Sequence, residues 1–181
     1  MKRVTNMLIA LLMVAVFSEF TYAQKMPGLD ASPADIAIFR PAGRGTPPLI
    51  KVVYGRPQKK NRTMLGDAEA YGKVWRTGAN ESTEIRLYKD VTFGDKKVSA
   101  GTYTLYSIPG KDEWTIILNS KLDTWGHYEY DESKDVARVK VPAGKTESEV
   151  EAFTIFFDGS DGSGNMNLAW ENTLVKVPLK Y

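Results

Sequence analysis

The feature that most limits what this chain can fold into is a succession of short β-type runs separated by turn residues, from Leu49 to the C-terminus. Hydrophobic and polar residues alternate over 84–88 and 136–141, which is the period of a strand with one buried face. Gly94-Asp95 and Pro109-Gly110 stand between such runs and favour chain reversals. No helical pattern is longer than two turns. We therefore predict an all-β fold with little helix, a single antiparallel β-sandwich or its jelly-roll variant.

The first residues have the pattern of a secretory signal peptide. Met1-Lys2-Arg3 is positively charged, residues 7–17 are apolar apart from small residues, and Thr21-Tyr22-Ala23 ends in a small residue. The apolar run is shorter than the ~20 residues that a membrane-spanning helix needs, so a retained anchor is the lesser alternative. We predict a signal peptide over 1–23, an N-terminal arm over 24–48 and the β-sandwich domain over 49–181. The mature protein is then periplasmic or secreted and has no transmembrane segment.

The composition narrows the available chemistry. The chain has no cysteine and a single histidine, His127. The lack of cysteine excludes disulfides, thiolate catalysis and cysteine-ligated metals. His127 has no companion histidine for a metal site and no recognisable nucleophile and acid for a triad, so we predict neither metal nor cofactor. The oxygen-rich run over 158–165 is predicted as a flexible hairpin loop, with a calcium cradle as the alternative.

Positive charge is concentrated in one part of the chain. The whole sequence carries a net charge of +2, whereas residues 40–76 contain nine Lys and Arg against two acidic residues. If the fold gathers these cations, their combined field attracts an anionic partner. The alternative is that they lie separately on loops, each in contact with water. Nucleic acid is not expected as a partner, because the chain has no recognition motif and is predicted to be exported.

The Trp75-Arg76 pair allows two arrangements. Gly78-Ala79-Asn80 follows it and favours a tight reversal, because Gly and Asn tolerate positive φ. Adjacent residues of an extended segment point to opposite faces, so only one of the pair is buried on a given side. If Trp75 is in the core, Arg76 is available to a ligand. If Arg76 points inward, it needs a buried carboxylate, for which Glu81 and Glu84 are nearest in sequence.

Arginines and aromatic residues form the strongest candidate for a binding site. Guanidinium groups bind carboxylate or phosphate bidentately, and exposed rings offer flat surfaces to a sugar or a cation. The structural alternative is that the four tryptophans form the core and the arginines pair with Glu81, Glu84 or Asp67. The predicted ligand-binding residues are Tyr54, Arg56, Arg62, Trp75, Arg76, Asn80, Trp125, His127 and Tyr128.

Three functional hypotheses follow from these residues. The first is binding of an anionic small molecule or a glycan of the cell envelope. The second is a hydrolase or lyase in which an arginine stabilises a developing anion and Tyr54, Tyr128 or His127 transfers a proton. The third is a structural or adhesion module that docks through a strand edge. The sequence favours the first hypothesis and leaves the ligand, any reaction and the oligomeric state open.

Several short motifs of the chain are similar to those of one family. They are Tyr54-Gly55-Arg56-Pro57, the run over 71–81, Ala100-Gly101-Thr102-Tyr103, Ile108-Pro109-Gly110 and Trp125-Gly126. With these motifs the chain resembles, from Ser32 to Pro178, the exported bacterial proteins grouped as domain of unknown function 2911 (DUF2911). The family pattern has serine at Gly55 and Leu-Val-Pro at 68–70, where this chain has Ala-Glu-Ala. The resemblance implies an exported single-domain protein and names no reaction.

Overall fold

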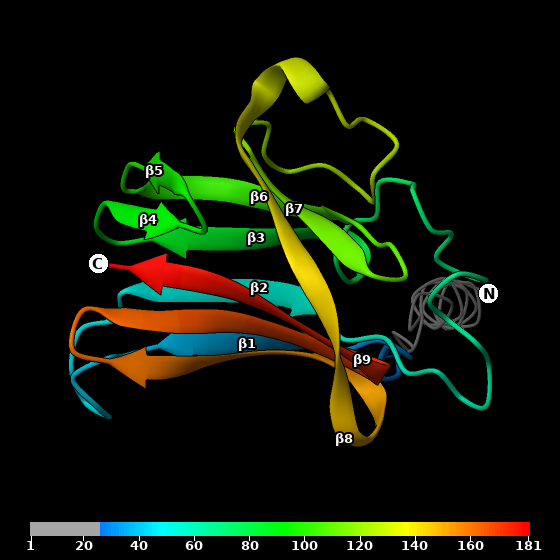
Figure 1. The fold of residues 1–181 in the computed structure, drawn as a ribbon. Helices are drawn as coiled ribbons and strands as arrows, with labels where there is room; N and C mark the ends of the chain where they lie inside the picture. Colours follow the sequence, from blue (N-terminus) through cyan, green and yellow to red (C-terminus); the bar gives the residue numbers. More distant parts are fainter. Residues whose placement is uncertain (1–25) are drawn as a thin grey trace, which may run out of the picture.

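The computed structural model describes residues 26–181, so the predicted signal peptide over 1–23 lies outside the described part of the chain. Within that part, no helix is long and apolar enough to cross a bilayer. Nine strands and one 3-10 helix make up the described fold (Figure 1). They are β1 (Ala34–Phe39), β2 (Ile50–Gly55), β3 (Ala79–Leu87), β4 (Val91–Phe93), β5 (Lys96–Val98), β6 (Gly101–Ile108), β7 (Glu113–Asn119), η1 (Glu132–Lys134), β8 (Asp135–Ser160) and β9 (Ser163–Lys180).

The nine strands pair antiparallel and form one sheet in the order β1-β2-β3-β6-β7-β8-β9-β4-β5. The predicted all-β, antiparallel fold with little helix is confirmed for residues 26–181. The predicted sandwich of separate sheets, and its jelly-roll variant, are not confirmed, because β8 joins the two parts of the sheet. Its residues 135–142 pair with β7, and its residues 143–160 pair with β9.

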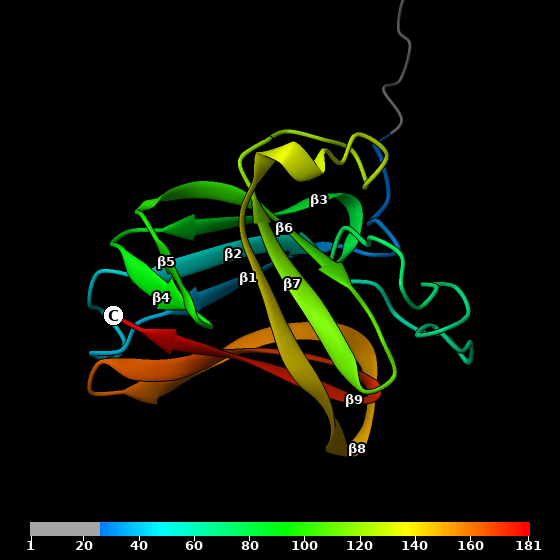
Figure 2. The same ribbon diagram turned by 45° about the horizontal axis from the view of Figure 1, so that its top comes forward.

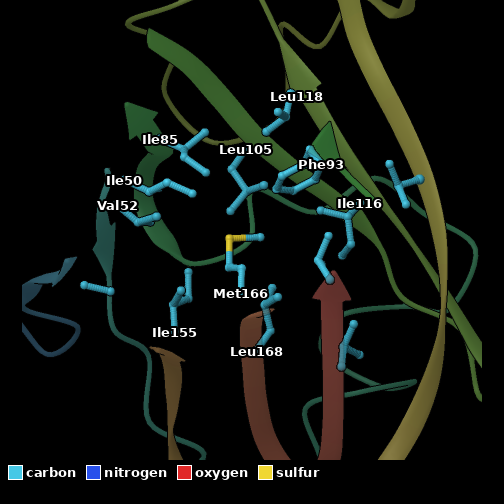
Figure 3. Packing of buried hydrophobic residues seen from close by; sticks show 14 of the residues in the cluster. Ile50, Val52, Ile85, Phe93, Leu105, Ile116, Leu118, Ile155, Met166 and Leu168 are labelled. Carbon is cyan, nitrogen blue, oxygen red and sulfur yellow. The ribbon is translucent and has the colours of Figure 1, made fainter. Parts of the chain in front are cut away.

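The sheet bends so that its two parts face each other across the hydrophobic core. Figure 2 shows β1, β2 and β3 on one side of this core and β9 on the other, and Figure 3 shows side chains from both parts pointing toward one another. Ile50 and Ile85 from the first part and Met166 from the second are fully buried. In β2 the buried positions are Ile50, Val52 and Tyr54, every second residue, as the alternation of side chains along a strand requires.

Trp75 is packed in this core among three other aromatic residues. Its indole stacks on Trp170 with ring centroids 5.6 Å apart, and it contacts Phe153 and Trp114 edge-on at 4.9 and 6.1 Å. Only 2% of Trp75 is exposed. Of the two arrangements that the sequence allows, the structure therefore has the one in which Trp75 is buried and Arg76 is left on the outer side.

Two parts of the C-terminal half differ from the sequence prediction. The alternating run over 136–141 does not end as a short strand, because it continues through residues 150–157 in one strand, β8. The run over 158–165 is not a flexible loop, because β8 and β9 remain paired up to a two-residue turn at Asp161-Gly162. These two residues have φ of 53° and 83°, which are the positive values of a type I′ turn. Such a turn matches the twist of the two strands and closes the hairpin tightly.

The predicted arm and the loop over 58–70 are both attached to the sheet. Residues 34–39 of the arm form the edge strand β1, which pairs with β2 along its length. The loop over 58–70 is attached to β9 by the carboxylate of Glu171. This carboxylate accepts hydrogen bonds from the backbone N–H groups of Met64 and Leu65 at 2.8 and 3.0 Å. The loop is thus held in place with little regular secondary structure.

Candidate functional site

The loop over 120–131, which follows β7, lies beside the segment that precedes β3 at one end of the sheet (Figures 1 and 2). We call this loop the aromatic loop, because it contains Trp125, His127 and Tyr128. The Gly126 N–H donates a hydrogen bond to the backbone oxygen of Asn80 at 3.2 Å. This backbone contact fixes the aromatic loop next to the turn that carries Arg76.

A tight turn holds Arg76 on the outer side of the core. Thr77 and Asn80 have φ of 53° and 62°, in the left-handed region. On the inner side, the Trp75 N–H donates to the backbone oxygen of Ser107 at 2.7 Å, and the buried Thr77 hydroxyl donates to the Ser107 hydroxyl at 2.9 Å. Because Trp75 is anchored inward, its neighbour Arg76 points outward, as adjacent residues of an extended segment do.

Arg76 has few partners of its own. Its Nε donates one long hydrogen bond, 3.4 Å, to the backbone oxygen of Gly78. Among residues 26–181, no carboxylate forms a salt bridge with it within 4.0 Å. Its guanidinium carbon lies 5.9 Å from the centroid of the Trp125 ring, within the range of a cation–π contact. Gly126 leaves room for the Arg76 side chain, since a Cβ at position 126 would lie 3.2 Å from Nη1 of Arg76.

The aromatic loop presents two exposed rings next to Arg76. Trp125 is 57% exposed and Tyr128 is 71% exposed. The two rings stack with centroids 5.6 Å apart and planes inclined by 14°, and the His127 ring stacks on Tyr128 at 4.9 Å. A cation beside exposed aromatic rings suits a ligand that combines an anionic group with a flat or sugar-like ring. We call Arg76, Trp125, His127 and Tyr128 the Arg76 site.

His127 has a ring nitrogen, Nδ1, that is shielded from solvent and has no hydrogen-bond partner among the described residues. Burial, and secondly the positive charge of Arg76, hold the pKa of His127 below its usual 6.5. The imidazole is therefore neutral at neutral pH, and one of its nitrogens can accept a hydrogen bond from a ligand. Within residues 26–181 there is no group of three or more His, Cys, Asp or Glu that could hold a metal ion.

Glu69 also lies near Arg76, although it was not predicted as a site residue. It is partly buried in the loop over 58–70, and this burial raises its pKa to about 6, while the charge of Arg76 opposes the rise. The two side chains do not form a salt bridge within 4.0 Å. No sequence signal identifies Glu69, because its position depends on the path of an irregular loop.

A polar cluster at the base of the aromatic loop holds the loop in place. The Tyr130 hydroxyl donates to the Asp135 carboxylate at 2.7 Å, and Arg138 Nη1 donates to both Tyr130 and Asp135 at 2.7 Å. Asn119 Nδ2 donates to Asp135 at 2.8 Å. Burial, and then the hydrogen bond to Asp135, raise the pKa of Tyr130 above its ordinary value, so this hydroxyl remains a donor. The cluster joins the loop to the start of β8.

Trp75 and Tyr54, which were also predicted as ligand-binding residues, lie in the core. They are only 2% and 3% exposed, so neither ring is available to a ligand in solvent. The Tyr54 hydroxyl instead accepts a hydrogen bond from the Ile155 N–H at 3.1 Å and donates to Asp35 at 3.3 Å. It therefore connects β2 with β8 and β1. The reason is the direction of the side chains, because both residues occupy inward-facing positions.

Arg56, Arg62 and Asn80, also predicted as ligand-binding residues, are engaged by other parts of the protein. Arg56 forms a salt bridge of 3.0 Å with Asp35 and a second hydrogen bond of 2.8 Å to β8. Arg62 donates to two backbone oxygens of its own loop at 2.9 and 3.0 Å. The Asn80 side chain donates to Asp30 of the N-terminal arm at 3.0 Å. Of the three predicted arginines, Arg76 alone joins Trp125, His127 and Tyr128.

Other cations of residues 40–76 are also bound individually. Lys59 forms a salt bridge of 2.7 Å with Glu149, and Arg40 donates a hydrogen bond to the backbone oxygen of Thr46. These contacts favour the alternative in which the cations of this segment are neutralised or solvated separately. Arg76 is therefore the one arginine of the predicted set whose guanidinium lies beside the aromatic loop.

A family model described as "Protein of unknown function (DUF2911)" matches residues 44–179. The matched range includes all four residues of the Arg76 site. No curated protein and no solved structure matches the chain.

Proposed function

The chain belongs to the DUF2911 family of proteins of unknown function, and we propose that it is an exported protein that binds an anionic, carbohydrate-like ligand of the cell envelope. Arg76 binds the anionic group, and the exposed rings of Trp125 and Tyr128 contact the sugar. The assignment to the periplasm or the cell exterior rests on the charged, apolar and small-residue pattern of residues 1–23.

The observation that carries the proposal is that the Arg76 guanidinium, which has no salt bridge to the described residues, lies beside two exposed aromatic rings. Arg56 already has a carboxylate partner at 3.0 Å, whereas no carboxylate among residues 26–181 forms a salt bridge with Arg76 within 4.0 Å. A ligand carboxylate can therefore bind Arg76 without first displacing a carboxylate of the described residues. The turn that fixes Arg76 also lowers the conformational entropy lost on binding.

Replacement of Arg76 tests the proposal. Arg76→Ala is expected to weaken binding of acidic oligosaccharides about ten- to a hundredfold, because hydrogen bonds to a charged group contribute roughly 1.5–3 kcal/mol. The measurement is isothermal titration calorimetry on protein lacking residues 1–23, with a panel of oligosaccharides that contain uronic acids. Arg62→Ala is the control, because it removes an equal charge from another loop. Equal affinities of the Arg76→Ala variant and the wild type would contradict the proposal.

A hydrolase or lyase is the second candidate, and one observation favours it. Glu69, with its pKa raised to about 6, and Arg76 combine a proton acceptor with a cation that can stabilise a developing anion. Chromatography of the same oligosaccharides after incubation with the protein detects any turnover. Product that disappears in Glu69→Gln but persists in Arg62→Ala would favour this function over binding alone.

A further inference from the structure

Two hollows lie along β3, and the first of them begins at Trp125 of the Arg76 site. Next to Trp125 lies a hollow of about 360 Å³, and a second hollow of about 340 Å³ extends to Ser32 in the N-terminal arm. Both hollows are lined by Glu81, Ser82 and Glu84, so they adjoin each other along β3, and we call the pair the groove. Each hollow has the volume of a small-ligand site, and together they accommodate an extended ligand.

Trp125 connects this groove with the Arg76 site. Trp125 and the three loop residues before it line the groove. The backbone of Trp125 also forms an isolated β-bridge with Glu81. The Arg76 guanidinium lies 5.9 Å from the same indole ring. A ligand that contacts Trp125 therefore reaches Arg76 at one end and the groove at the other.

The groove has the opposite charge to Arg76. Glu81, Glu84 and Asp123 line it, and none of them forms a salt bridge within 4.0 Å in the part of the chain that the structure describes. Ionised carboxylates only accept hydrogen bonds, so they suit the hydroxyl groups of a sugar. The same carboxylates repel an anionic group that enters the groove.

We propose that the ligand is a saccharide with one terminal acidic sugar on an uncharged chain. The acidic sugar binds at Arg76, the uncharged chain lies along the groove, and Glu81, Glu84 and Asp123 exclude chains that are anionic throughout. This inference rests on the proposed binding function of the Arg76 site. It adds a selectivity that Arg76 alone does not provide, because a lone guanidinium would favour the ligand with more negative charges.

The test compares matched pairs of oligosaccharides of equal length and linkage. One member of each pair has a single terminal uronic acid on a neutral chain, and the other consists of uronic acids throughout. We expect the wild type to bind the best singly acidic member at least tenfold more tightly than its polyanionic counterpart. The double variant Glu81→Gln and Glu84→Gln should bind the polyanionic member about tenfold better than the wild type does, because glutamine keeps an acceptor oxygen and removes the charge.

Glu147→Gln is the matched control, because Glu147 is an exposed residue of β8 that does not line the groove. In this variant the ratio of the affinities for the singly acidic and polyanionic members should stay within twofold of the wild-type ratio. Equal or tighter wild-type binding of the polyanionic members would overturn the inference while leaving the Arg76 site intact. Absence of binding to every singly acidic member would also overturn it. Affinities that do not change in Arg76→Ala would instead refute the binding function on which the inference rests.

Discussion

Glu69 and Arg76 lie near each other without forming a salt bridge, and this arrangement affects stability. Burial raises the pKa of Glu69 from 4.5 to about 6, which means that its ionised form is disfavoured in the folded protein. The attraction of Arg76 reduces this effect but does not cancel it. The contribution of Glu69 to stability is therefore fully present below pH 4.5 and is lost as the pH rises through about 6.

Glu69→Gln should remove this pH dependence. Above pH 7 the variant is expected to be more stable than the wild type by about 1 kcal/mol, after allowance for the screening of a partly exposed group by water. Near pH 4 the two proteins should have equal stability, because the wild-type carboxyl is then protonated in both states. Urea unfolding at pH 4, 5.5 and 7.5 measures the difference, with Glu147→Gln as the control. If the stability difference between Glu69→Gln and the wild type is largest at pH 4, the pKa of Glu69 is not raised by folding.

The aromatic loop depends on contacts at its base more than on regular structure. Between β7 and β8 the chain forms only the short 3-10 helix η1, which begins after Asp131. The Tyr130 hydroxyl connects the loop to Asp135 and Arg138 at 2.7 Å each. Because the exposed rings lie earlier in the same loop, this base controls how well they are ordered beside Arg76.

Tyr130→Phe should loosen the aromatic loop and lower the free energy of unfolding by roughly 2 kcal/mol, because it removes two hydrogen bonds to charged groups, those with Asp135 and Arg138. Affinity for acidic oligosaccharides should fall about threefold to tenfold, since the rings must then be ordered on binding. Tyr103→Phe is the matched control, because the Tyr103 hydroxyl donates to Ser99 at 2.9 Å in another part of the sheet. If both variants bind as tightly as the wild type, the loop does not need this support.

The charges of the whole molecule produce little long-range attraction of an anion to the Arg76 site. The net charge is only +2, and the basic segment over 40–76 has several cations in internal contacts. The groove next to Trp125 is acidic and opposes long-range attraction of anions. Binding of an anion should therefore depend on contact with one guanidinium rather than on a broad positive surface.

A shallow salt dependence is the expected consequence. Raising the NaCl concentration from 0.05 to 0.5 M should weaken binding of a singly acidic oligosaccharide by about threefold to tenfold, because one exposed ion pair is screened. In Arg76→Ala the residual binding should hardly change with salt. Calorimetric titrations at four salt concentrations provide the slope. If the affinity falls a thousandfold over this range of salt, several cations contact the ligand.

Local residue patterns were enough to predict the strands. Side chains alternate between the two faces of a strand, so the alternation over 84–88 and 136–141 marked β3 and β8, and Gly94-Asp95 marked the turn between β4 and β5. The pattern was not enough to show that β8 continues through 142–150, because that continuity depends on a change of partner from β7 to β9. The single bent sheet was missed for this reason.

The sequence by itself determined the all-β class and most of the strands. It left open whether Trp75 or Arg76 is buried, and the tertiary structure decided this in favour of Trp75. The tertiary structure decided which arginines are neutralised, because their partners are distant in the chain. Arg56 meets Asp35 across 21 positions and Thr154 across 98. The pairing of strands sets such contacts, and residue order alone does not. Arg76 has no carboxylate partner among residues 26–181, because its turn directs it toward Trp125. That contact forms only when the aromatic loop folds against β3.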